Sequence, residues 1–95
     1  MTAYLIARVT VRDPARYPDY TAATPALIAR HGGRFIVRGG NPATLEGPEE
    51  NRRIVVIEFP DRAAVEAFYA DPDYEAVRAI RWESAESELI VVDGV

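Results

Sequence analysis

The sequence has 95 residues, which is the size of one domain and leaves no room for a second. Its net charge is −4 at pH 7 and no basic run offsets it, so we expect no nucleic-acid partner. All eleven cationic residues are Arg and Cys is absent, which excludes Schiff-base lysine chemistry, disulfides, thiolate nucleophiles and Cys-ligated metals.

Two further patterns are missing from the sequence. No apolar stretch approaches the roughly 20 residues that a membrane span needs, and the N-terminus does not have the pattern of a signal peptide. We therefore expect a cytoplasmic protein without membrane contact, formed by residues 1–95 as a single domain.

The chain begins with a strand and a helix. Apolar residues alternate over Ala3–Val11, which predicts the strand. Asp13 followed by Pro14 predicts the start of the helix, with Asp as the N-cap and Pro at the first helical position. An interior proline removes a helical hydrogen bond, so we expect an irregular first turn at Pro18 and a kink near Pro25. The Gly-Gly pair that follows the helix supplies its left-handed C-terminal stop.

Two strands joined by a long connection come next. The strands are predicted over Arg34–Arg38 and Arg53–Phe59, and the polar segment Gly39–Asn51 separates them. Most hairpin loops have about 2–5 residues, so this connection is long for a hairpin. Asp61 is the predicted N-cap of the helix that follows the second of these strands.

A second start signal, Asp71 followed by Pro72, breaks the helical region and opens a piece that runs to about Trp82. A strand over Glu88–Val92 completes the order β-α-β-β-α-β, which is the split-βαβ, ferredoxin-like arrangement of the α+β class. Its two right-handed crossovers place the helices on one face of a four-stranded antiparallel sheet.

Alternation along the strands divides this sheet into two faces. The face under the helices is predicted to carry only apolar side chains: Leu5, Ala7, Val9, Val11, Phe35, Val37, Val55, Ile57, Phe59, Leu89 and Val91. The outer face is predicted to carry apolar and charged side chains: Tyr4, Ile6, Ile36, Ile54, Val56, Ile90, Val92, Arg8, Arg34, Arg38, Glu58 and Glu88. Its seven apolar side chains are too many for a face in water, so we expect a homodimer packed sheet to sheet.

Four segments together resemble a known family. They are Tyr4–Val9, His31–Gly40, Val55–Pro60 and Asp71–Tyr74. In this order they resemble the domain-of-unknown-function 1330 family over essentially the whole chain. The resemblance implies a dimeric α/β barrel, the architecture shared with antibiotic-biosynthesis-type monooxygenases, muconolactone isomerases and stress-responsive barrel proteins. The family has no established reaction, so the resemblance implies a fold and a dimer and leaves the chemistry open.

His31 is the first candidate site residue, because it is the only histidine and ordinarily titrates near neutral pH. It is a candidate general base, or an axial haem ligand as in some other families with this barrel. The alternative is a helix-end histidine stabilised by the helix dipole. One His and no Cys argue against a metal site with several ligands, and we predict neither a metal nor a cofactor.

Arg38 and the glycines Gly39 and Gly40 form the second candidate. A guanidinium at a strand end can bind a carboxylate in a bidentate manner, and the glycines allow a ligand close to the backbone. The alternative for Arg38 is an ion pair with Glu58 on the outer face. Glu58 is itself a candidate base, since a carboxylate in an apolar strand can have a raised pKa, and its alternative is an ion pair with Arg8 or Arg38.

The third candidate is a pocket between the helices and the sheet. Its predicted aromatic lining is Tyr20, Tyr69, Tyr74 and Trp82, with hydroxyl groups as polar contacts, although aromatic residues at helical spacing also form ordinary cores. Arg78 and Arg81 are candidates for guiding an anionic substrate, with solvated helix-face charges as the favoured alternative.

Two functions fit this sequence. The first is a cofactor-independent enzyme of monooxygenase, isomerase or lyase type that acts on a small anionic, aromatic or enolisable compound. The second is a non-catalytic small-ligand-binding or stress-response dimer. No Gly-rich phosphate loop, nucleophile elbow or catalytic triad is present in the sequence to decide between them.

Overall fold

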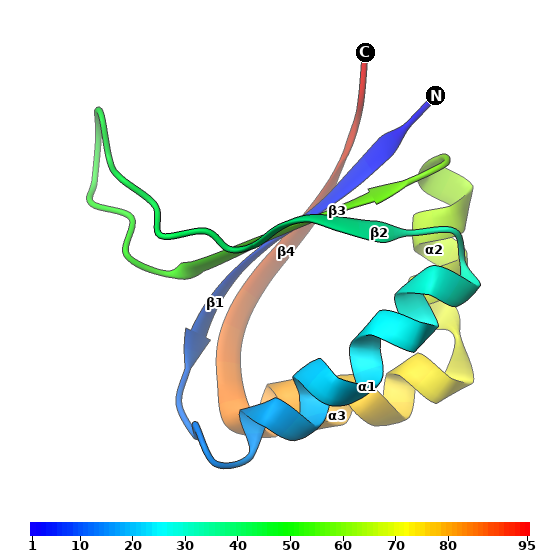
Figure 1. The fold of residues 1–95 in the computed structure, drawn as a ribbon, viewed down its shortest axis with the longest axis horizontal. Helices are drawn as coiled ribbons and strands as arrows, with labels where there is room; N and C mark the ends of the chain where they lie inside the picture. The colour runs from blue at the N-terminus through cyan, green and yellow to red at the C-terminus, as the bar shows by residue number, and fades with distance from the viewer.

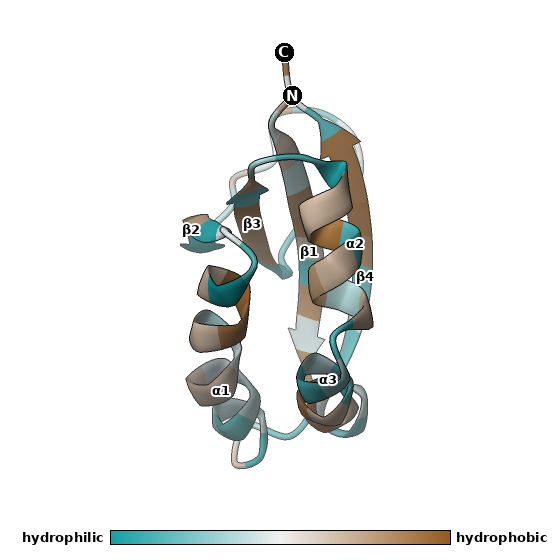
Figure 2. Cartoon of the chain, turned by 90° about the vertical axis from the view of Figure 1, so that its right-hand side faces the viewer, coloured by the Kyte–Doolittle hydropathy of each residue, from teal (hydrophilic) through white to brown (hydrophobic).

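The computed structural model describes residues 1–95 and confirms the predicted element order (Figure 1). The elements are β1 (Ala3–Val11), α1 (Tyr17–Arg30), β2 (Arg34–Gly39), β3 (Arg53–Phe59), α2 (Arg62–Ala70), α3 (Pro72–Ser84) and β4 (Ala85–Asp93). The four strands form one antiparallel sheet in the order β2-β3-β1-β4. Figure 2 shows the three helices on one side of this sheet, as the ferredoxin-like arrangement requires. None of the helices combines the length and apolar character needed to cross a membrane.

Helix α1 begins later than predicted, at Tyr17 instead of Pro14. The Asp13 side chain does accept hydrogen bonds from backbone amides, but these amides belong to a turn that precedes the helix. Its Oδ1 accepts from the amides of Ala15 and Arg16, at 3.1 and 3.2 Å. The chain becomes helical only afterwards, and Pro18 lies in the first turn, where its missing N–H has no intrahelical partner to lose.

The end of α1 follows the prediction. Gly32 has φ +79°, the left-handed conformation that glycine adopts without strain. The amide of Gly33 donates to the carbonyl of Ile28 at 2.9 Å, and the amide of Gly32 donates to that of Ala29 at 3.0 Å, which is the Schellman pattern. A Cβ on Gly33 would lie 2.7 Å from the Phe59 ring, so this glycine also allows the end of α1 to pack closely against β3.

Helices α2 and α3 begin at the two predicted aspartates. Asp61 accepts a hydrogen bond from the amide of Ala64 at 2.8 Å, and Asp71 accepts one from the amide of Asp73 at 2.9 Å. Strand β4 begins at Ala85, three residues before the predicted Glu88. These extra residues are polar or small, and they are strand because β1 is long enough to pair with them.

A β-bulge in β2 overturns part of the predicted division into faces. Phe35 is paired with Ile57, but the next pair along the ladder joins Val37 to Val56, so Ile36 is an extra residue. One extra residue moves every later side chain to the opposite face. Val37 therefore lies on the outer face with Val56. Arg38, paired with Val55, lies on the face under the helices. The predicted positions of these two residues were wrong.

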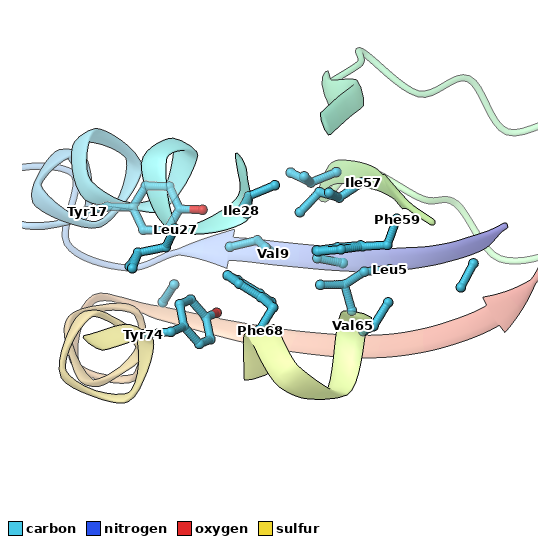
Figure 3. Packing of buried hydrophobic residues seen from close by; sticks show 14 residues of the cluster. Leu5, Val9, Tyr17, Leu27, Ile28, Ile57, Phe59, Val65, Phe68 and Tyr74 are labelled. Carbon is cyan, nitrogen blue, oxygen red and sulfur yellow. The ribbon is translucent and has the colours of Figure 1, made fainter. Parts of the chain in front are cut away.

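The core lies between the helices and the sheet (Figure 3). Phe68 stacks on Tyr74 with ring centroids 4.2 Å apart and on Phe59 at 5.6 Å. The predicted inward residues of β1 and β3 are buried, except that Val11, at the end of its strand, is exposed. Burial of these side chains supplies most of the stabilisation of a domain of this size.

The outer face of the sheet remains partly exposed and apolar. Ile36 and Ile90 are 44% and 48% exposed, and Val92 is also exposed. Ile36 is the extra residue of the β2 bulge, and Ile90 and Val92 are in β4. This face therefore exposes more large apolar side chains than a solvated sheet face usually does.

Candidate functional site

A cavity of about 420 Å³ lies on the helix side of the sheet, within the size range of small-molecule sites. Its walls come from α1, α2 and α3 and from all four strands. Most of its lining is apolar: Leu5, Ala7, Val9, Pro25, Phe35, Val55, Ile57, Phe68 and Leu89. The remaining lining residues are Tyr17, Tyr20, Thr21, Thr24, Arg38, Arg53, Tyr74 and Arg81. The lining thus contains three arginines and no carboxylate, although the chain has 15 Asp and Glu residues.

Arg81 is the most deeply buried charge of the cavity, with only 3% of its surface exposed. Its Nη1 donates a hydrogen bond to the Ser87 hydroxyl, while its Nε and Nη2 have no partner. Its guanidinium carbon lies 5.8 Å from the centroid of the Tyr20 ring. A buried charge without a counter-charge is costly, and an anion beside Arg81 would offset that cost.

The sequence analysis favoured a solvated position for Arg81, and this was wrong. Arg81 follows Tyr74 by seven residues, which is two helical turns, so both side chains lie on the face of α3 that packs toward α1. That spacing was readable in the sequence and is the signal that could have placed Arg81 inside.

Tyr20 and Tyr74 meet beside Arg81, with their hydroxyl oxygens 2.8 Å apart. Burial raises the pKa of Tyr20, and the adjacent Tyr74 raises it further, so the Tyr20 phenol keeps its proton at neutral pH. One hydroxyl proton is used in the hydrogen bond between the two rings. The other remains available, so the pair can donate one hydrogen bond to a ligand.

Arg53 and Arg38 lie on the other side of the cavity. Arg53 is half-buried and its Nε has no hydrogen-bond partner. Burial raises the pKa of the neighbouring Tyr17, while the positive charge of Arg53 offsets part of that increase. Arg38 is exposed at the cavity mouth, where its guanidinium lies 3.8 Å from the centroid of the Phe35 ring. Neither arginine forms an ion pair with a carboxylate.

The sequence analysis did not single out Arg53 or Tyr17. Arg53 lies two residues before Val55 and four before Ile57 in β3. Because side chains alternate between the two faces of a strand, this spacing alone places Arg53 on the helix side. Gly39, a predicted ligand contact, is next to it: a Cβ at Gly39 would lie 2.8 Å from Arg53 Nη1. Neither Gly39 nor Gly40 lines the cavity.

The other predicted catalytic residues lie away from the cavity. His31 is at the C-terminal end of α1, and its Nε2 is 2.8 Å from Asp71 Oδ2. Glu58 is on the outer face and accepts a hydrogen bond from Arg34 at 3.2 Å. The predicted ion pair of Glu58 with either Arg8 or Arg38 was therefore wrong.

Of the predicted aromatic lining, Tyr20 and Tyr74 do line the cavity, while Tyr69 and Trp82 do not. The guanidinium of Arg78 lies over both of these outer rings, 4.6 Å from Tyr69 and 4.7 Å from Trp82. These cation–π contacts stabilise the helix layer, and Arg78 does not line the cavity. No group of three or more His, Asp or Glu side chains converges on a common point.

Comparison with known proteins bears on the whole chain. A family model described as "Domain of unknown function (DUF1330)" matches residues 2–95. No curated protein sequence matches the chain.

Several solved structures share the fold. The RPA0582 protein of unknown function from Rhodopseudomonas palustris is 23% identical with a TM-score of 0.80, over 99% of this chain and 82% of that one. SnoaB, a cofactor-independent oxygenase from Streptomyces nogalater, is 21% identical with a TM-score of 0.72, over 99% and 93%. A dimeric ferredoxin-like protein of unknown function from Jannaschia sp. CCS1 is 13% identical with a TM-score of 0.67, over 99% and 100%.

Proposed function

This chain belongs to the DUF1330 family, a family of unknown function, and we propose that it is a cofactor-independent enzyme that acts on a small apolar compound in its anionic form. The observation that carries this proposal is Arg81, a buried cation without a carboxylate partner on the wall of a largely apolar cavity. An enolate, phenolate or carboxylate of the substrate would supply the missing negative charge.

The cavity residues support stabilisation of an anion more than removal of a proton. No Asp, Glu or His lines the cavity, and the raised pKa of Tyr20 makes that phenol a poor base. The substrate must therefore be acidic enough to ionise when Arg81 and the free proton of the Tyr20–Tyr74 pair stabilise its oxyanion. The substrate proton leaves to water. An enolate held in this way can give one electron to dioxygen; the two resulting radicals then combine through a new C–O bond, and the peroxide anion takes a proton from water to give a hydroperoxide. Alternatively, the enolate can be reprotonated at another carbon.

The likeness to SnoaB supports the oxygenase version of this proposal, because that protein is a cofactor-independent oxygenase of the same fold. We also propose that two copies pack through the outer faces of their sheets. The exposed Ile36, Ile90 and Val92 support this, as do two structurally similar proteins that are described as dimeric.

A second candidate function is a non-catalytic small-ligand-binding dimer. The observation that favours it is the same absence of a carboxylate or imidazole from the cavity lining, since a binding module needs a counter-charge and no base.

The test begins with a panel of enolisable aromatic ketones and phenols. Dioxygen consumption is followed with an electrode, and exchange of the acidic C–H for deuterium is followed by NMR. We expect turnover with at least one compound, and Arg81→Met should reduce kcat/KM by about 100-fold or more, as loss of one donor to an oxyanion does. The matched control is Arg62→Met, which removes an arginine that pairs with Asp93 outside the cavity. Compounds that bind through Arg81 but show neither oxygen uptake nor exchange would favour the binding module.

A further inference from the structure

The arginines of the cavity form two groups on opposite sides of it. The first group is Arg81, which contacts an edge strand of the sheet. Arg81 donates to Ser87 of β4, which is one edge strand, and lies against Tyr20. Arg53 is on β3 and lies close to Gly39 of β2, the opposite edge strand.

The strand register fixes what lies between the two groups. Val9 of β1 is paired with Arg53 on one side and with Ser87 on the other, so these three residues form one row across the sheet. Paired residues of neighbouring strands point to the same face, so Arg53 and Ser87 flank Val9 on the helix side of the sheet. The row spans two interstrand spacings, which is about 10 Å between the backbones of its outer members.

Each side of this row has a donor without a hydrogen-bond partner: Nε and Nη2 of Arg81, which is bound to Ser87, and Nε of Arg53, which lies next to Gly39. The lining between them, Val9 and the adjacent Ala7, is apolar. The exposure of the three arginines also rises stepwise, from buried Arg81 through half-buried Arg53 to exposed Arg38 at the mouth.

We propose that the cavity binds a molecule with two acidic groups, one held by Arg81 with Tyr20 and Tyr74, and the other held by Arg53 with Arg38, across an apolar middle that lies on Val9. This inference rests on the proposed function and adds the class of its substrate, a compound with a carboxylate in addition to the enolate or phenolate that reacts. The carboxylate end faces the mouth, so the reacting end enters first and is the end withdrawn from water.

The β-bulge is what completes the second group. Without the extra residue at Ile36, strict alternation would turn Arg38 to the outer face, and Arg53 would be the only cation on its side of the cavity. Bulges are frequent beside functional sites because they redirect a side chain in this way. The stacking of Arg38 on Phe35 holds its guanidinium beside the cavity in the absence of a carboxylate.

The experiment measures binding by isothermal titration calorimetry with three dicarboxylates of increasing length: isophthalate, terephthalate and naphthalene-2,6-dicarboxylate. Each is compared with its own monoamide, which keeps the shape and loses one charge, and with its neutral diamide. We expect at least one dicarboxylate to bind about 10-fold or more tightly than its monoamide, and the monoamide to bind more tightly than the diamide.

Variants then identify which group of arginines each charge contacts. Arg53→Met should lower the affinity for the preferred dicarboxylate to that of its monoamide, while the monoamide keeps its affinity within about two-fold. Arg38→Met should produce a smaller loss of the same kind, because Arg38 is exposed. Arg62→Met, the control for overall charge, should change the affinities for dicarboxylate and monoamide by a similar small factor. Thermal unfolding of each variant verifies that it is folded.

The possible failures can be distinguished. Equal affinity for every dicarboxylate and its monoamide, with weaker binding of the diamide, would overturn the inference of a second anion position and leave the proposed function standing. Equal affinity for charged and neutral compounds, or no binding of any of them, would overturn both. A preference for the dicarboxylate that survives Arg53→Met and Arg38→Met would overturn the assignment of the second position.

Discussion

The two faces of the sheet both carry arginines, but only one of them pairs these arginines with carboxylates. On the outer face, Arg34 contacts Glu58 at 3.2 Å and Arg8 contacts Glu50 at 3.5 Å. On the helix side, Arg38, Arg53 and Arg81 line the cavity without any carboxylate. The difference is informative because burial makes an unpaired charge more costly, and the unpaired charges are on the more buried side. Paired charges are consistent with a structural role, and the unpaired ones with a ligand.

The apolar side chains of the two faces differ in a parallel way. Under the helices they are buried around the cavity, and on the outer face Ile36, Ile90 and Val92 remain exposed. The partners proposed for the two faces therefore differ in kind: a small anion on the helix side, and an apolar surface on the outer side. Substitutions on each face test this contrast.

The largest effect is expected on the outer face. Ile90→Asp places a carboxylate among apolar side chains, and in a two-fold dimer it does so twice. The dimer dissociation constant should increase by about 1000-fold or more, which corresponds to about 4 kcal/mol. Sedimentation velocity over a range of protein concentrations measures it. Leu45→Asp, at an exposed position of the β2–β3 connection, is the control and should leave the assembly unchanged. A dimer that persists in Ile90→Asp would place the interface elsewhere.

The next effect concerns stability on the helix side. Arg81→Met removes a buried charge that has no counter-charge and keeps much of the side-chain volume. Without ligand, the free energy of unfolding should rise by about 1–2 kcal/mol, because residues retained for binding often reduce stability. Urea denaturation measures this change. A decrease of the same size would mean that the contacts of Arg81 with Ser87 and the tyrosines are structural, and would weaken the proposed anion site.

The smallest effect is expected at an ion pair near the outer face. Hydrogen bonds from Arg52 lower the pKa of Glu50 to about 2. The unfolded chain, in which this carboxyl has its ordinary pKa, takes up the proton first as the pH falls. The stabilisation from Glu50 is therefore present at neutral pH and is lost progressively between about pH 5 and pH 2. Glu50→Gln should lower the melting temperature slightly at pH 7 and have no effect near pH 2. A difference that is the same at both pH values would contradict this account.

Some features of the fold could be predicted locally. The aspartates at positions 61 and 71 cap their helices as expected, since a side chain that accepts an amide hydrogen bond acts within three residues. The Asp13 signal was misread because the same side chain also stabilises a turn, and Pro18 decided where the helix itself begins. Strand β4 was predicted too short because its first residues gain strand structure from their partner, β1.

The candidate site was less predictable than the fold. The sequence pointed to Tyr20, Tyr74 and Arg38, but Arg38 reaches the cavity through a bulge that alternation does not reveal. His31 and Glu58 were chosen for their chemistry, and they lie beside Asp71 and Arg34, outside the cavity. Arg53 and Arg81 carry no motif, and strand parity and helical spacing are the only signals that mark them.

The sequence by itself determined the order of elements, the helix stops and caps, and the existence of two sheet faces, because these depend on interactions between residues close in the chain. The tertiary structure decided which charges acquire partners. Arg81 is unpaired because α1 and the sheet close over it, and Arg38 faces the cavity because β2 and β3 slip by one residue. Such pairing depends on residues far apart in sequence, where an offset of one position moves a charge from one face of the sheet to the other.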